Sequence, residues 1–175
     1  MLALLLVGSN VLLLIRYSTV QRALQEAVDE YRAANYAPAG RVLPILPGRN
    51  AAGESLSVDP SASGQFLLLL FDPFCRACDE NWPRWKDLLN HEETKYKRAV
   101  LFVSTSQIVP REYVENHEMQ GSLILAGLAD DLTNEFHLRR SPQTILVRRG
   151  RIVRSWGGVL SKTDLSEIQE ALLVR

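Results

Sequence analysis

The stretch Phe66-Leu-Leu-Leu-Leu-Phe71-Asp-Pro-Phe-Cys75-Arg-Ala-Cys78-Asp-Glu-Asn-Trp-Pro83 decides the fold of this chain. It begins with an apolar run of strand length, which is typical of strands that are buried on both faces. Pro73 favours a turn after this run, and the residues from Cys75 onward suit the start of a helix. The sequence therefore predicts a buried strand, a turn and a helix, with two cysteines at the junction.

These cysteines are the only two of the chain. At the start of a helix, unpaired backbone N–H groups and the helix dipole favour an anion. The thiolate is the reactive form of cysteine, so Cys75 is the candidate nucleophile. A spacing of three residues brings Cys78 beneath Cys75, close enough for a disulfide. Cys78 is thus the candidate resolving thiol.

Two other interpretations of the cysteine pair are weaker. A zinc site needs two further ligands, and His91, His117 and His137 do not have the spacing of a compact zinc module. A structural disulfide across so short a loop stabilises a fold very little. The sequence therefore favours a redox-active pair with no metal.

Four features carry a resemblance to the thioredoxin superfamily, which runs from this stretch to the C-terminus. They are the strand–turn–Cys75-Arg-Ala-Cys78–helix motif, Pro83 in the helix, Ser141-Pro142 followed by Gln-Thr-Ile-Leu-Val, and a closing segment from Arg149-Gly150 through Gly157-Gly158 to Leu160–Leu165. The resemblance implies an α/β fold, a three-layer sandwich with a mixed sheet. The alternation of predicted strands and helices agrees with that class.

Within the superfamily the chain looks most similar to the membrane-anchored TlpA/ResA group and to MauD-like proteins. Two departures matter. Phe74 stands where tryptophan is commoner, and Asn81 stands where the TlpA/ResA group often has a glutamate. The buried aspartate of cytoplasmic thioredoxin is replaced by Leu69. The resemblance implies a thiol–disulfide oxidoreductase that acts on protein disulfides or dithiols, without a cofactor.

The resemblance also implies further site residues. Pro142 is expected in the cis form, with the Ser141 backbone free to pair with a partner protein. Phe74 and Arg76 are expected to contact the partner. The positive charge of Arg76 should stabilise the Cys75 thiolate. Three acidic residues oppose it, namely Asp72, Asp79 and Glu80. The sequence therefore leaves the direction of electron flow open.

Composition excludes nucleic acid as a partner. Lys and Arg together number 20, as do Asp and Glu, and no aromatic side chains interleave with a basic patch. A copper-binding module of the same fold, with His137 as a third ligand, is the alternative function. A redox-inert scaffold is a further alternative. The residues before Cys75 do not fit the peroxiredoxin pattern.

Residues 1–15 are free of charged side chains and mostly apolar, but a bilayer crossing takes about 20 residues. A secretory signal and a short core helix are competing interpretations. We expect a membrane anchor whose natural start lies further upstream, followed by an amphipathic stalk. The basic residues Arg16 and Arg22 follow the apolar segment, which by the positive-inside rule favours a cytoplasmic domain. The resemblance instead implies a periplasmic one.

The chain thus divides into an anchor and stalk (1–35), a linker with a short hairpin (36–64) and a thioredoxin-like domain (65–175). The hairpin is expected to pair 42–45 with 55–58, around Pro-Gly-Arg-Asn. Further strands are expected at 99–103 and 122–126, and helices at 110–117 and 129–136. Ser161 should cap the last helix, with Asp164 completing the cap.

Aromatic and histidine side chains near the motif have ordinary interpretations. Trp82 and Trp85 are expected in the core, with Trp82 the better candidate for a substrate contact. His117 and His137 are expected to be solvated near helix ends.

Overall fold

The computed structural model describes residues 2–90 and 99–174, so His91 lies outside the described residues. The chain divides into two compact units, and the boundary falls between Asn35 and Tyr36. The first unit is one long helix, α1 (Leu2–Asn35). Its apolar side chains in the C-terminal half, such as Val20, Leu24 and Tyr31, are exposed.

The expected membrane-spanning segment is not found. None of the helices, over the residues that the structure describes, is both long enough and apolar enough to cross a bilayer. The residues of the predicted stalk are helical and form the C-terminal part of α1. The anchor itself is therefore only a prediction.

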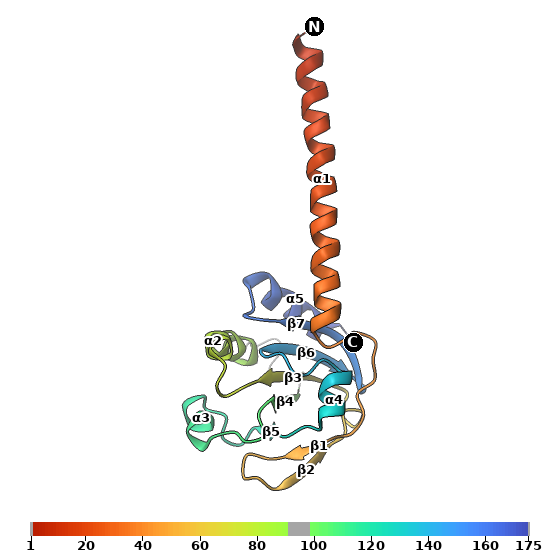
Figure 1. Cartoon of the computed structure of the whole chain (residues 1–175). Coiled ribbons are helices and arrows are strands. Elements are labelled where there is room, and N and C mark those ends of the chain that lie inside the picture. The colour runs from red at the N-terminus through yellow and green to blue at the C-terminus, as the bar shows by residue number, and fades with distance from the viewer. Residues whose placement is uncertain (1, 91–98, 175) are drawn as a thin grey trace. The chain divides into compact units, whose positions relative to one another are not determined.

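The second unit is built on a mixed sheet in the order β5-β4-β3-β6-β7 (Figure 1). Its strands are β3 (Gln65–Phe71), β4 (Ala99–Ser104), β5 (Leu123–Leu125), β6 (Gln143–Arg148) and β7 (Arg151–Gly157). β4 runs parallel to β3 and β5 parallel to β4, whereas β6 and β7 are antiparallel to their neighbours. The apolar run of the opening motif is the central strand, as expected for a segment buried on both faces.

Helices cover both faces of this sheet, which gives the predicted three layers. They are α2 (Arg76–Asn90), α3 (Arg111–Asn116), α4 (Asp130–Glu135) and α5 (Lys162–Leu173). Alternate residues of β3 point to opposite faces. Leu67, Leu69 and Phe71 pack in one core with residues of α2, α3 and α5. Phe66, Leu68 and Leu70 pack in a second core, on the side of α4 (Figure 1).

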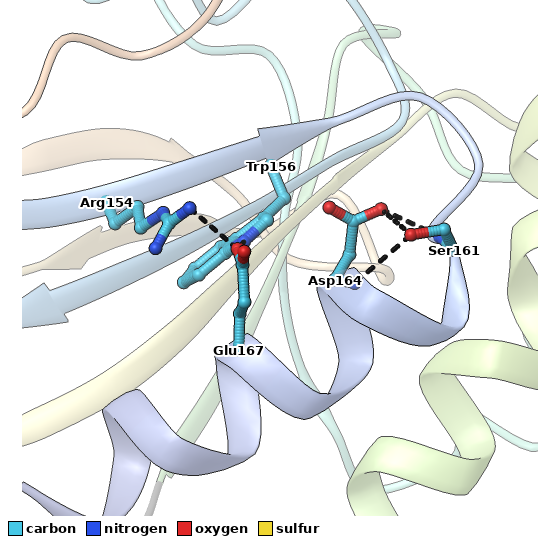
Figure 2. Close-up of polar contacts among 5 residues, drawn as sticks. All are labelled: Arg154, Trp156, Ser161, Asp164 and Glu167. Carbon is cyan, nitrogen blue, oxygen red and sulfur yellow. Dashed lines mark hydrogen bonds and ion pairs between the residues drawn. The ribbon is translucent and has the colours of Figure 1, made fainter. Parts of the chain in front are cut away.

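The last helix begins with the predicted cap (Figure 2). The Ser161 hydroxyl accepts a hydrogen bond from Asp164 N, and the Asp164 carboxylate accepts one from Ser161 N. One turn on, Glu167 accepts a hydrogen bond from the Trp156 indole and forms an ion pair with Arg154. These contacts fix α5 against β7, on the face that also carries α2.

The expected hairpin is wrong in its first strand. β1 (Leu46–Arg49) pairs with β2 (Ser55–Val58), so Pro47 and Gly48 lie inside the strand and not in the turn. Gly48 has a physical reason to be there, because a Cβ would lie 2.6 Å from the Ala126 carbonyl oxygen. The close approach lets Arg49 exchange both backbone hydrogen bonds with Ala126. The turn is made instead around Asn50, whose side chain accepts from two backbone N–H groups.

The segment just after Asn35 runs along the edge strand β7. Gly40 N donates to Ile152 O, Ile152 N donates to the Arg41 carbonyl, and Leu43 N donates to Gly150 O. At the other end Tyr36 covers Gly157, where a Cβ would lie 2.0 Å from the tyrosine ring. This segment protects a sheet edge that would otherwise offer unpaired backbone groups.

Candidate active site

Cys75 lies where the turn after β3 becomes helix α2. Its N–H donates to the Asp72 carbonyl, and its own carbonyl accepts from Cys78 N and Asp79 N, which closes the first helical turn. The Cys75 thiol is partly buried and is not in a disulfide. It therefore lies at the positive end of the helix, in contact with solvent.

Cys78 lies beneath Cys75 and is fully buried. Its Sγ accepts a hydrogen bond from Asp72 N at 3.5 Å. Burial, followed by the hydrogen bond between the two thiols, raises the pKa of Cys78 from 9.0 to about 12. The pair therefore combines one accessible sulfur with one that is protonated and shielded.

The Ser141–Pro142 peptide is cis, as the resemblance implied. The Ser141 carbonyl accepts a hydrogen bond from the Cys75 thiol, with a sulfur–oxygen distance of 3.7 Å. Ser141 is half-buried and Pro142 is buried. The loop before β6 thus lies directly against the accessible cysteine, although the two segments are far apart in sequence.

Phe74 and Arg76, the other two predicted contact residues, both point outward. Phe74 is 80% exposed, which is unusual for so large an apolar side chain. The Arg76 side chain is 93% exposed and binds Glu80 one turn along the helix, at 2.9 Å. The positive charge of Arg76 therefore pairs with a neighbouring carboxylate. The sequence predicts instead that this charge stabilises the Cys75 thiolate.

The sequence identifies Asp72 only as a charge near the cysteines. In the structure it also connects two loops at the site through hydrogen bonds. Its carboxylate accepts hydrogen bonds from Phe74 N and from the hydroxyls of Thr105 and Ser106. Desolvation acts to raise the pKa of this carboxyl, but the hydrogen bonds outweigh it and the pKa lies below its usual value. Asp72 joins the cysteine turn to the loop after β4.

His117 lies in an environment that differs from the one predicted from the sequence. Its side chain is 15% exposed, with Nε2 3.4 Å from Oδ1 of Asp79. The ring stacks on Tyr113 and meets the Trp82 ring edge-on. The prediction of a solvated histidine is wrong here, because α3 folds back onto α2. His137 is half-buried, with its Nδ1 shielded from solvent, and its backbone has a positive φ.

The two tryptophans of α2 are buried, as predicted. The Trp85 indole donates to the Thr144 hydroxyl at 2.8 Å, across to β6. Asn81, the departure from the TlpA/ResA pattern, is also buried and accepts a hydrogen bond from Leu160 N. It therefore connects α2 to the segment before α5.

No group of three or more His, Cys, Asp or Glu side chains that could hold a metal ion was found among residues 2–90 and 99–174.

Comparisons with known proteins place this geometry in a known fold. No protein-family model matches the chain, and no curated protein matches it. Among solved structures, the thioredoxin domain of a Bacteroides vulgatus thiol-disulfide oxidoreductase is 22% identical, with a TM-score of 0.59 over 78% of this chain and 98% of that one. A thio-disulfide isomerase from Thermus thermophilus is 19% identical, with a TM-score of 0.57 over 78% and 98%. StoA from Bacillus subtilis is 16% identical, with a TM-score of 0.54 over 74% and 98%.

Proposed function

We propose that this chain, which has the thioredoxin fold, is a protein thiol–disulfide oxidoreductase. The observation that carries the proposal is the pair itself, with a partly exposed Cys75 at a helix start and a buried Cys78 in hydrogen-bond contact beneath it. The cis-Pro142 loop against Cys75 adds a place for a partner chain. Solved structures of the same fold include several described as thiol-disulfide oxidoreductases.

The reaction would proceed in two exchanges. The Cys75 thiolate attacks one sulfur of a partner disulfide, forms a mixed disulfide and releases the other partner sulfur as a thiolate. Cys78 then gives up its proton and attacks the Cys75 sulfur, which frees the second partner thiolate. Two electrons pass to the partner, and Cys75 and Cys78 are left as a disulfide. The same steps in reverse oxidise a partner dithiol.

The partner segment would lie between the exposed Phe74 and the Ser141–Pro142 loop. An extended chain there can pair with backbone groups of Ser141, as in strand addition. Phe74 offers apolar contact and Arg76 a charge at the rim. Because backbone pairing is not sequence-specific, the specificity would come from these side chains.

A trapping experiment tests the function. The full chain with Cys78→Ser should accumulate mixed disulfides between Cys75 and partner proteins, because the resolving thiol is gone. The species would be isolated under non-reducing conditions and identified by mass spectrometry. Cys75→Ser is the matched control, since it keeps one thiol but loses the accessible one. Equal trapping by both variants, or trapping by neither, would contradict the proposal.

We further propose that the domain acts on the extracytoplasmic side of a bacterial membrane. The apolar residues 1–15 and the similarity to the membrane-anchored TlpA/ResA group support this location. Labelling of Phe74→Cys in a Cys75→Ser, Cys78→Ser background with a membrane-impermeant maleimide tests it in intact spheroplasts. The proposal expects labelling without lysis, and it is wrong if labelling requires lysis.

A further inference from the structure

The carboxylate of Asp72 is held in one position by three hydrogen bonds. Oδ1 accepts from Phe74 N at 2.8 Å, and Oδ2 accepts from the Thr105 and Ser106 hydroxyls at 2.7 and 3.0 Å. Donors of this kind stabilise the charged form of a carboxyl group, and the pKa of Asp72 is lowered accordingly. Asp72 is therefore a fixed negative charge at neutral pH.

The backbone of the same residue contacts both cysteines. Asp72 N donates to the buried Cys78 Sγ at 3.5 Å, and the Asp72 carbonyl accepts from Cys75 N at 3.1 Å. The charge is thus tied to the cysteine turn by the chain itself.

Other charged groups around the pair are already engaged. Arg76 binds Glu80, and Asp79 lies against His117. The buried Tyr113 hydroxyl has its pKa raised, by burial first and then by the nearby Asp79 and cysteines, so it is neutral. Over the described residues, no basic side chain forms an ion pair with Asp72. Its charge is consequently not neutralised at the site.

We infer that Asp72 biases the Cys75–Cys78 pair toward giving electrons to partner disulfides. A fixed negative charge opposes the thiolate that Cys75 must form, so it makes the reduced state less stable. A protein dithiol that is less stable relative to its disulfide is a stronger reductant. In the balanced reaction, the protein dithiol and a partner disulfide become the protein disulfide and a partner dithiol, with two electrons and two protons transferred. Asp72 acts here as a positioning and electrostatic residue, and this inference depends on the proposed function.

The test is the redox equilibrium of the full chain with glutathione. One protein dithiol and one glutathione disulfide give one protein disulfide and two glutathione thiols, and the equilibrium constant measures the reducing strength. Asp72→Asn keeps the shape and an acceptor for Phe74 N but removes the charge. We expect its constant at about pH 7 to fall roughly tenfold, which corresponds to a potential about 30 mV less reducing.

Two further variants test whether the Asp72 charge is responsible. Thr105→Val with Ser106→Ala removes two of the donors that hold the carboxylate, so its constant should fall less than that of Asp72→Asn. Asp87→Asn removes an exposed charge from α2 and should stay within about twofold of wild type. An unchanged constant in Asp72→Asn, or a fall of the same size in Asp87→Asn, overturns the inference alone. A wild-type pair that does not exchange with glutathione at all overturns the proposed function as well.

Discussion

His117 and Asp79 come from different helices and meet beside the cysteine pair, with Nε2 of the histidine 3.4 Å from Oδ1 of the aspartate. Asp79 directly follows Cys78, so α3 is tied to the first turn of α2 at the site. The histidine ring also stacks on Tyr113 with 3.9 Å between ring centroids. Aromatic stacking and one partly exposed histidine–aspartate contact therefore hold α3 in place.

Removing the ring should destabilise the domain more than removing the charge. We expect His117→Ala to lower the free energy of unfolding by about 1–2 kcal/mol, because two aromatic contacts are lost. Asp79→Asn should cost no more than about 0.5 kcal/mol, because the aspartate side chain is 57% exposed. Urea unfolding followed by tryptophan fluorescence compares the two. A larger loss for Asp79→Asn would mean that the contact between His117 and Asp79, and not the stacking, holds α3.

The sequence predicted the elements whose signals are local. The apolar run to Phe71 and the turn at Pro73 predicted β3 and the start of α2, and the Ser161 cap was readable from its spacing to Asp164. The cis form of Pro142 came from the resemblance and is observed. These features depend on few residues that are close in sequence.

What the sequence could not give depends on distant contacts. The environment of His117 is not predictable locally, because its partners Asp79 and Trp82 belong to another helix. The first strand of the hairpin is predicted before its observed position because Pro47-Gly48 is a typical turn signal. Here the glycine is needed for the close approach to Ala126, which no local pattern shows.

The buried hydrogen bond between α2 and β6 should contribute measurably to the free energy of unfolding. Trp85 donates to the Thr144 hydroxyl inside the core. Trp85→Phe leaves that hydroxyl without its donor and removes packing, so we expect a loss of about 2–4 kcal/mol in unfolding free energy. Thr144→Val should cost about 1–3 kcal/mol, because the indole N–H loses its acceptor.

The double variant completes this comparison. If the two groups depend on each other, Trp85→Phe with Thr144→Val loses less than the sum of the single variants by at least about 0.5 kcal/mol. Chemical denaturation of the four proteins gives this coupling energy. Strict additivity would show that the two side chains contribute to stability independently.

Gly157 should not tolerate a side chain. A Cβ there would lie 2.0 Å from the Tyr36 ring, so Gly157→Ala must displace the segment that covers β7. We expect a loss of about 1–3 kcal/mol. Gly64→Ala is the matched control, because a Cβ there meets nothing within 4 Å, and it should stay within about 0.5 kcal/mol of wild type.

A second substitution shows whether the tyrosine ring is the cause. In a Tyr36→Ala background the space above Gly157 is open, so adding Gly157→Ala should cost much less than it does in wild type. Thermal unfolding of the four proteins is sufficient to measure this. An equal cost in both backgrounds would place the strain in the strand itself.

The buried thiol should make the stability of the reduced protein sensitive to alkali. The pKa of Cys78 rises from 9.0 to about 12 on folding, so the folded protein holds this proton more tightly than the unfolded chain does. The resulting stability is complete below about pH 9 and is lost as the pH rises toward about 12. Unfolding free energies of reduced wild type should therefore fall between pH 8.5 and 10.5, and Cys78→Ala should fall less steeply. Burial also raises the pKa of Tyr113, and its contribution in the same direction persists in the variant.

Parallel slopes for the two proteins would mean that Cys78 does not hold its proton as its burial requires. In that case, alkylation of the native protein near pH 8 would modify both cysteines, where the structure predicts modification of Cys75 alone.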